Sequence, residues 1–112
     1  MKKEIVLFAI FSLSLLLIMF GAGLNITAVT SNGCRMPVYT YDYNFSSNTH
    51  FTFTNRSSVN NFYLTDIINL NYVSLSIGDI LIVLGLIISM YLYVNPILVN
   101  YKKSKLLNNT DG

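Results

Sequence analysis

Two long apolar runs constrain what this chain can fold into more than any other feature. Residues 5–24 and 77–94 contain no Lys, Arg or Glu, and each is close to the ~20 residues that an α-helix needs to cross the hydrocarbon of a bilayer. A polar stretch, residues 25–75, separates the two runs. The sequence therefore predicts an all-α membrane fold, in which two transmembrane helices form a hairpin.

The composition agrees with a membrane protein and excludes a nucleic-acid-binding protein. Hydrophobic residues make up 53% of the chain and charged residues 11%, against about 45–50% and about 25% in soluble proteins. The net charge of +2 is small and dispersed, whereas a nucleic-acid surface needs clustered Lys and Arg. We therefore expect the lipid bilayer, and no nucleic acid, among the partners of this chain.

Basic side chains are concentrated at the two ends of the chain, and only Arg35 and Arg56 lie between the apolar runs. The lysines are Lys2, Lys3, Lys102, Lys103 and Lys105. Basic residues near the ends of spans are retained in the cytoplasm. This predicts a multi-pass protein with a cytoplasmic N-terminus at 1–4, spans at 5–24 and 76–95, an extracytoplasmic segment at 25–75, and a cytoplasmic basic tail at 96–112. The Asn-, Ile- and Tyr-rich usage is typical of an AT-rich bacterial genome, so we expect the bacterial plasma membrane.

The first run has an alternative interpretation as a cleaved signal peptide. Lys2 and Lys3 would form its basic start, and Gly21 and Gly23 have the small-residue spacing of a cleavage site. The apolar core of a signal peptide is only ~7–15 residues long, however. The length of the run favours a retained helix, and cleavage would leave a one-span protein with the same outer segment.

The second run begins with a helix-start signal. Ser76 and Asp79 have the spacing of a capping box, in which each residue accepts a hydrogen bond from the backbone N–H of the other. We therefore expect Asp79 to be a solvated cap at the membrane surface, and the alternative is an ion-translocating carboxylate. At the other end of the run, Asn95 and Pro96 predict a helix break or kink.

Small residues mark one face of the second run. Gly78, Gly85 and Ser89 recur at helical spacing, and small residues let membrane helices approach closely. This predicts helix packing through Gly85 and Ser89 against the first span or another subunit. Because Gly is common in membrane helices, the same face could instead contact lipid.

The outer segment contains two patterns. Residues 38–45 and 49–54 alternate aromatic with polar side chains around a turn cluster at 46–48, which predicts a short β-hairpin. After it, apolar side chains recur at helical spacing over 58–70. That spacing predicts a short amphipathic helix lying along the membrane surface.

The polar side chains of the outer segment form no standard catalytic or metal-binding signature. Cys34 is the single cysteine, so it cannot form a disulfide within one chain. We predict no metal, no cofactor and no catalytic residue. A polar cluster that closes the outer segment onto the helix ends is the sharper hypothesis, and separate local caps are the alternative; the candidate residues are Asn32, His50, Asp66 and Asp79.

Two motifs carry a resemblance to a known family. The segments 32–38, Asn-Gly-Cys-Arg-Met-Pro-Val, and 76–79, Ser-Ile-Gly-Asp, with His50 and a Leu-Thr-Asp ending at Asp66 between them, resemble the C-terminal half of DUF5317, a bacterial membrane family of unknown function. The likeness covers about 25–86, and Thr65 stands where the family usually has Gly. The resemblance supports the membrane fold and implies no activity. The positions it singles out are Asn32, Gly33, Met36, Pro37, His50, Asp66, Ser76, Gly78 and Asp79.

The first hypothesis for function is a non-enzymatic accessory or interaction subunit that binds another membrane protein or a second copy of itself. The alternative is a component of an ion or solute transport assembly, although no ionisable residue lies deeper in either span than Asp79. A third hypothesis is an enzyme in which His50 acts as a general base oriented by Asp66.

Overall fold

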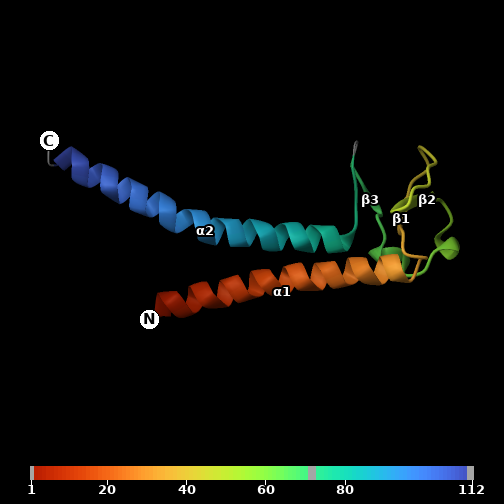
Figure 1. Cartoon of the computed structure of the whole chain (residues 1–112), viewed down its shortest axis with the longest axis horizontal. Helices are drawn as coiled ribbons and strands as arrows, with labels where there is room; N and C mark the ends of the chain where they lie inside the picture. The colour runs from red at the N-terminus through yellow and green to blue at the C-terminus, as the bar shows by residue number, and fades with distance from the viewer. Residues whose placement is uncertain (1, 71–72, 111–112) are drawn as a thin grey trace.

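The computed structural model describes residues 2–70 and 73–110 as two long helices joined by a small, mostly extended segment (Figure 1). Helix α1 spans Lys2–Thr30 and helix α2 spans Ile77–Thr110. They run antiparallel, so both ends of the chain lie at one end of the molecule (Figure 1). Both helices are long and apolar enough to cross a membrane. Parts of the predicted termini and outer segment, at residues 1, 71–72 and 111–112, lie outside the described residues.

Both helices are longer than the predicted spans. Helix α1 continues six residues past residue 24, and α2 continues through Pro96 into the basic tail. A break at Pro96 is therefore wrong, but α2 does bend away from α1 in its second half (Figure 1). Proline lacks the N–H that would bond to the preceding turn, which is a common cause of such bends.

The two helices meet along a seam of small residues. On α1 the buried positions are Ser14, Gly21 and Ala28, which are spaced seven residues apart and so lie on one face. A Cβ added to Gly21 would lie 2.5 Å from the carbonyl oxygen of Gly78, and one added to Gly85 would lie 2.6 Å from the carbonyl oxygen of Ser14. At these points backbone packs directly on backbone, as it does between membrane helices.

The seam keeps one register along its length. Gly78 lies against Asn25, Gly85 against Ile18, and Ser89 against Ser14. The Ser14 hydroxyl donates to the carbonyl of Phe11, and it also shares a 2.9 Å hydrogen bond with the Ser89 hydroxyl. The small face predicted for the second run, including Gly85 and Ser89, therefore packs against α1 within the chain.

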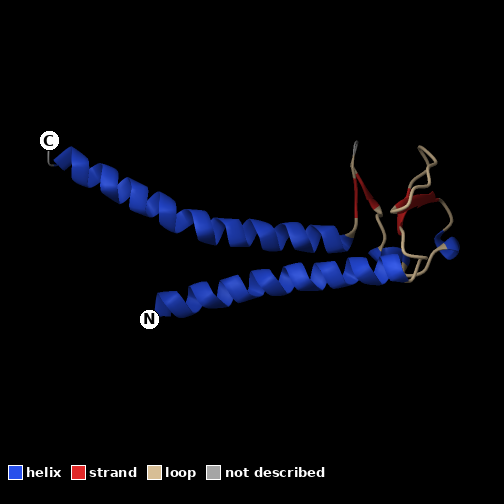
Figure 2. Cartoon of the chain, in the orientation of Figure 1, coloured by secondary structure: helices blue, strands red, loops and turns tan. Residues whose placement is uncertain are grey.

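The connecting segment, residues 31–76, carries four short strands (Figure 2). Strands β1 (Met36–Tyr39) and β2 (His50–Phe53) pair in parallel, with Met36 opposite His50. Strands β3 (Ile68–Asn69) and β4 (Ser74–Leu75) pair antiparallel just before α2. The chain is therefore mostly helical with small strands: the two long helices fit the predicted all-α class, and the strands are confined to the connecting segment.

The predicted β-hairpin is wrong in its pairing. The turn at 46–48 does form, and beside it Ser46 makes an antiparallel bridge with Phe51. The ladder of β2, however, is made with β1 running in the same direction. Alternation identifies a half-buried strand but does not specify its neighbour, and here the burial of Met36, Val38 and Phe53 selects the parallel partner.

The predicted amphipathic helix at 58–70 is also wrong. This part of the chain contains two single 3-10 turns, η1 (Arg56–Ser58) and η2 (Phe62–Leu64), followed by extended backbone. Between the turns Asn61 has a left-handed φ of 52°, and both backbone groups of Asn60 bond to the side chain of Asn32. A continuous helix cannot include a left-handed residue or backbone groups committed to a distant side chain.

Candidate functional site

Three polar side chains join the C-terminal part of α1 to the N-terminal end of α2, and we call them the clasp: Asn25, Ser76 and Asp79. The Asn25 amide donates to Oδ1 of Asp79 over 2.8 Å, and the Ser76 hydroxyl donates to Oδ1 of Asn25 over 2.6 Å. The capping box closes the ring, since the backbone N–H of Ser76 donates to Oδ2 of Asp79 and that of Asp79 donates to the Ser76 hydroxyl. Each side-chain oxygen of the clasp therefore takes part in a hydrogen bond.

This geometry modifies the prediction for Asp79. The residue is a helix cap as expected, but it is half-buried rather than fully solvated. Its carboxylate lies in the first turn of α2, where the positive end of the helix dipole stabilises an anion. The clasp is therefore a satisfied structural network, and every part of it except Asn25 follows from the capping-box spacing.

Beside the clasp, Asp66 is the most unusual ionisable residue of the connecting segment. Its side chain is only 6% exposed, and its Oδ2 lies 3.9 Å from Nε2 of His50. Its other carboxylate oxygen, Oδ1, is buried without a hydrogen-bond partner in the part of the chain that the structure describes. A buried carboxylate oxygen without a partner is costly when charged.

The environment accordingly favours the protonated form of Asp66. Burial, and secondarily the negative charge of Asp79, raise the pKa of Asp66 from 3.8 to about 7. The backbone holds the residue in place, because its N–H donates to the carbonyl of Pro37 and its carbonyl accepts from the N–H of Tyr39. Asp66 thus lies along the edge of β1 opposite to β2, and Val38 pairs with it there.

Asn32 does not join this group. Its amide donates to the carbonyls of Ala28 and Asn60, and its oxygen accepts from the N–H of Asn60. The structure therefore brings His50 close to Asp66, with Asp79 near enough to affect its charge. Asn32 instead ties the end of α1 to the loop before η2.

The Asn-Gly-x-x-Met-Pro motif forms the exit from α1. The chain reverses at Gly33 and Cys34, which have left-handed φ angles of 71° and 64°. Glycine adopts this conformation without steric strain, because it has no Cβ. Met36 and Pro37 follow as buried residues of β1. The Pro37 carbonyl accepts from Asp66, so this motif positions the buried carboxylate.

The sequence analysis missed Asn25, which supplies the α1 side of the clasp. One signal could have found it, because Asn25 lies four residues after Gly21 and continues the stripe of Ser14 and Gly21 along one helix face. The seven-residue spacing of Ser14, Gly21 and Ala28 marks that stripe in the sequence. In residues 2–70 and 73–110, no group of three His, Cys, Asp or Glu side chains is arranged to hold a metal.

The fold and the site define a class: a small protein with two apolar helices packed through a small-residue seam, and a polar clasp beside a folded connecting segment. The family model described as "Family of unknown function (DUF5317)" matches residues 5–91, most of the chain. The chain therefore belongs to the DUF5317 family. The match begins within α1, earlier than the range 25–86 over which the motifs resemble the family. No curated protein and no solved structure matches the chain.

Proposed function

We propose that this chain is a non-enzymatic membrane subunit that crosses the bacterial plasma membrane twice and binds another membrane protein. Both termini lie in the cytoplasm and the connecting segment lies outside, in keeping with the lysines at the chain ends. The observation that carries the proposal is the outward surface of the helix pair. The small residues face one another, so the large apolar side chains are left facing out.

The outward surface of the helices is extensive. Phe8, Leu16 and Phe20 on α1 are each more than 60% exposed, and on α2 Ile87 is 58% and Met90 65% exposed. Lipid can cover such a surface, and so can the helices of a partner. The hairpin has already used its small-residue face internally, so a partner would contact the larger side chains.

The connecting segment supports the same proposal. Arg56 stacks over the rings of Phe62 and Tyr63, at 4.3 and 5.5 Å from their centroids. Tyr63 is 66% exposed. Tyr41, which is 73% exposed, is connected to this stack through the ring of Tyr39. Exposed tyrosine together with arginine is typical of protein-binding surfaces.

Site-specific photo-crosslinking in native membranes tests the proposal. A benzophenone amino acid is placed at Phe20 or Ile87, both of which point away from the seam. We expect one or both positions to capture a membrane protein or a second copy of the chain. The same probe at Ser104, in the basic tail, controls for non-specific capture. If Phe20 and Ile87 capture only lipid, the subunit proposal is wrong.

A transport role is the alternative, and it has less support. The seam polar groups Ser14 and Ser89 bond to each other, and the carboxylate of Asp79 is satisfied by the clasp. An ion path would need polar groups that are free to exchange partners. Ion flux in liposomes that disappears in the variant Asp79→Asn would favour transport over the subunit proposal.

A further inference from the structure

The two helices separate toward the chain termini and leave a crevice between them. The helices pack closely at the clasp and along the seam, and they diverge toward the N- and C-terminal end (Figure 1). There a hollow of about 460 Å³ opens between the first turns of α1 and the part of α2 around Pro96. Its volume lies within the ~300–1,000 Å³ typical of ligand pockets.

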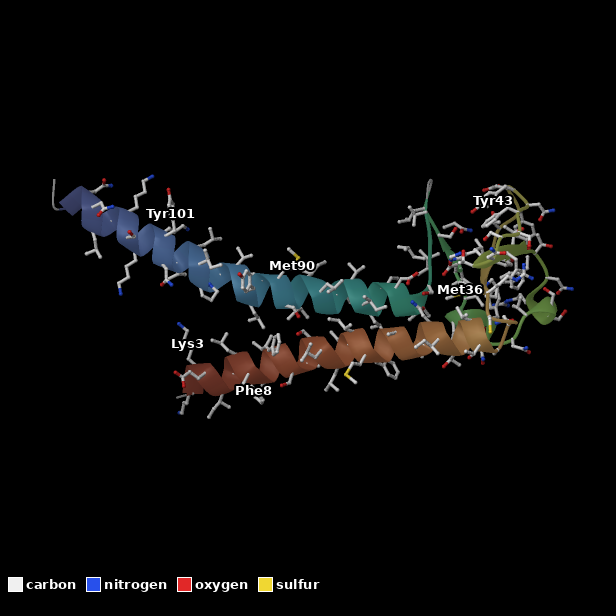
Figure 3. All side chains as sticks on the ribbon, in the orientation of Figure 1. Lys3, Phe8, Met36, Tyr43, Met90 and Tyr101 are labelled. Atoms are coloured by element: carbon white, nitrogen blue, oxygen red, sulfur yellow. The ribbon has the colours of Figure 1, made fainter. Side chains whose placement is uncertain are left out.

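The crevice is lined by both apolar and polar side chains. Leu7, Ile10 and Val99 line the apolar part. Lys3, Asn95 and Asn100 line the polar part, and Lys3 extends from α1 toward α2 (Figure 3). Among the described residues the only ion pair is the one between His50 and Asp66, so the Lys3 ammonium has no carboxylate partner there.

The Lys3 end of the crevice lies at the depth of a membrane surface in the proposed topology. Lys3 precedes Asn25 of the clasp by 22 residues of the same helix, which corresponds to about 33 Å at ~1.5 Å per residue. The hydrocarbon core of a bilayer is about 30 Å thick. If the clasp lies at one surface, the Lys3 ammonium therefore lies at the other, at headgroup level.

We propose that this crevice binds an anionic phospholipid. One acyl chain lies against Leu7, Ile10 and Val99, and the phosphate accepts hydrogen bonds from the Lys3 ammonium and from the amides of Asn95 and Asn100. Basic pockets between membrane helices are suited to this chemistry, because lysine supplies charge while the apolar walls replace neighbouring lipid tails. The inference rests on the membrane insertion proposed above, and it does not depend on a protein partner.

Lipid retention by the purified protein tests this inference. The full-length chain is purified in a nonionic detergent and titrated with phosphatidylglycerol or phosphatidylcholine carrying the same acyl chains. Bound lipid is counted by native mass spectrometry. We expect one phosphatidylglycerol to be retained in preference to phosphatidylcholine. The variant Lys3→Gln should weaken this retention on the order of fivefold, the contribution of one lysine near anionic lipid.

A matched control separates the crevice from general charge attraction. Lys2→Gln removes the same charge from the neighbouring residue, which does not line the crevice, and should leave retention unchanged. Ile10→Trp fills the apolar part and should lower retention without changing the net charge. Equal losses in Lys2→Gln and Lys3→Gln, no headgroup preference, or no effect of Ile10→Trp would overturn the inference.

The competing occupant is a partner helix. A benzophenone amino acid at Ile10 in native membranes should capture phospholipid, and capture of a protein at this position would also overturn the inference. The subunit proposal is tested separately, by photo-crosslinking from Phe20 and Ile87. The two ideas can therefore fail independently.

Discussion

The side-chain amide of Asn25 donates a hydrogen bond to the carboxylate of Asp79 over 2.8 Å, and this contact links the end of α1 to the first turn of α2. Replacing Asn25 by Val would leave an oxygen of Asp79 without its donor and the Ser76 hydroxyl without its acceptor. We expect the variant to lower the free energy of unfolding by about 1–3 kcal/mol, the cost of unpaired buried polar groups.

Unfolding of the purified protein in mixed micelles, followed by circular dichroism, measures this change. Thr30→Val is the control, since the exposed Thr30 hydroxyl bonds only to carbonyls of its own helix. A loss for Asn25→Val no larger than the loss for Thr30→Val would show that the clasp does not stabilise the hairpin.

Two helix glycines should respond to alanine in opposite directions. A Cβ at Gly85 would lie 2.6 Å from the backbone of α1, whereas a Cβ at Gly23 would have no neighbour within 4 Å. Gly23→Ala should therefore raise the free energy of unfolding by up to about 1 kcal/mol through helix propensity. Gly85→Ala should lower it by about 1–3 kcal/mol, because the helices must separate. The same unfolding assay measures both, and equal signs would contradict the close seam.

The helix pair was largely predictable from the sequence, and the partners across it were not. Apolar length predicted both helices, the spacing of Gly78, Gly85 and Ser89 identified the packed face of α2, and Ser76 with Asp79 indicated the cap. These are local patterns with the period of a helix. Asn25 lies on the helix face that Ser14 and Gly21 mark, but its partners Ser76 and Asp79 are 51 and 54 positions away, and no local pattern identifies them.

The connecting segment was poorly predicted for the same reason. The apolar spacing over 58–70 is helical, but the left-handed Asn61 and the contact from Asn32 to Asn60 override it. Tertiary contacts commonly overrule local preference in this way. The pairing of His50 with Asp66 was part of the predicted cluster, yet the burial of Asp66 could not be predicted without knowing that it lies along β1.

The buried Asp66 makes the connecting segment sensitive to pH. Its pKa is raised from 3.8 to about 7, so the folded state binds this proton more tightly than the unfolded state does. The contribution of Asp66 to stability is therefore fully present below about pH 4 and is lost as the pH rises through about 7. This loss is at most on the order of 4 kcal/mol, at about 1.4 kcal/mol per pKa unit, and screening by solvent reduces it. His50 and Asp79 are the ionisable groups that face this carboxyl.

The variant Asp66→Asn should not lose stability as the pH rises, because its amide does not ionise. It should therefore be more stable than the wild type at pH 8. Thermal unfolding of the purified protein at pH 5 and pH 8, followed by near-ultraviolet circular dichroism of the tyrosines, measures the difference. Asp42→Asn removes an exposed carboxylate of the same segment and should behave like the wild type. If Asp66→Asn keeps the pH dependence of the wild type, another group is responsible.

Cys34 provides a natural test of the proposed orientation. It is the single cysteine of the sequence and is exposed at the end of α1. A membrane-impermeant maleimide added to intact cells should therefore label it. In a Cys34→Ser background, the variant Ser104→Cys should be labelled only after permeabilisation. The reverse pattern would show that the termini are outside.

The clasp joins residues that leave the ribosome at very different times. Asn25 is synthesised before the connecting segment and Asp79 after it, so their bond can form only once every residue between them has been synthesised. Until then the amide of Asn25 has no partner from α2. Closure of the hairpin is therefore a late event in biogenesis, and in the proposed topology it follows the transfer of the whole connecting segment to the outer side of the membrane.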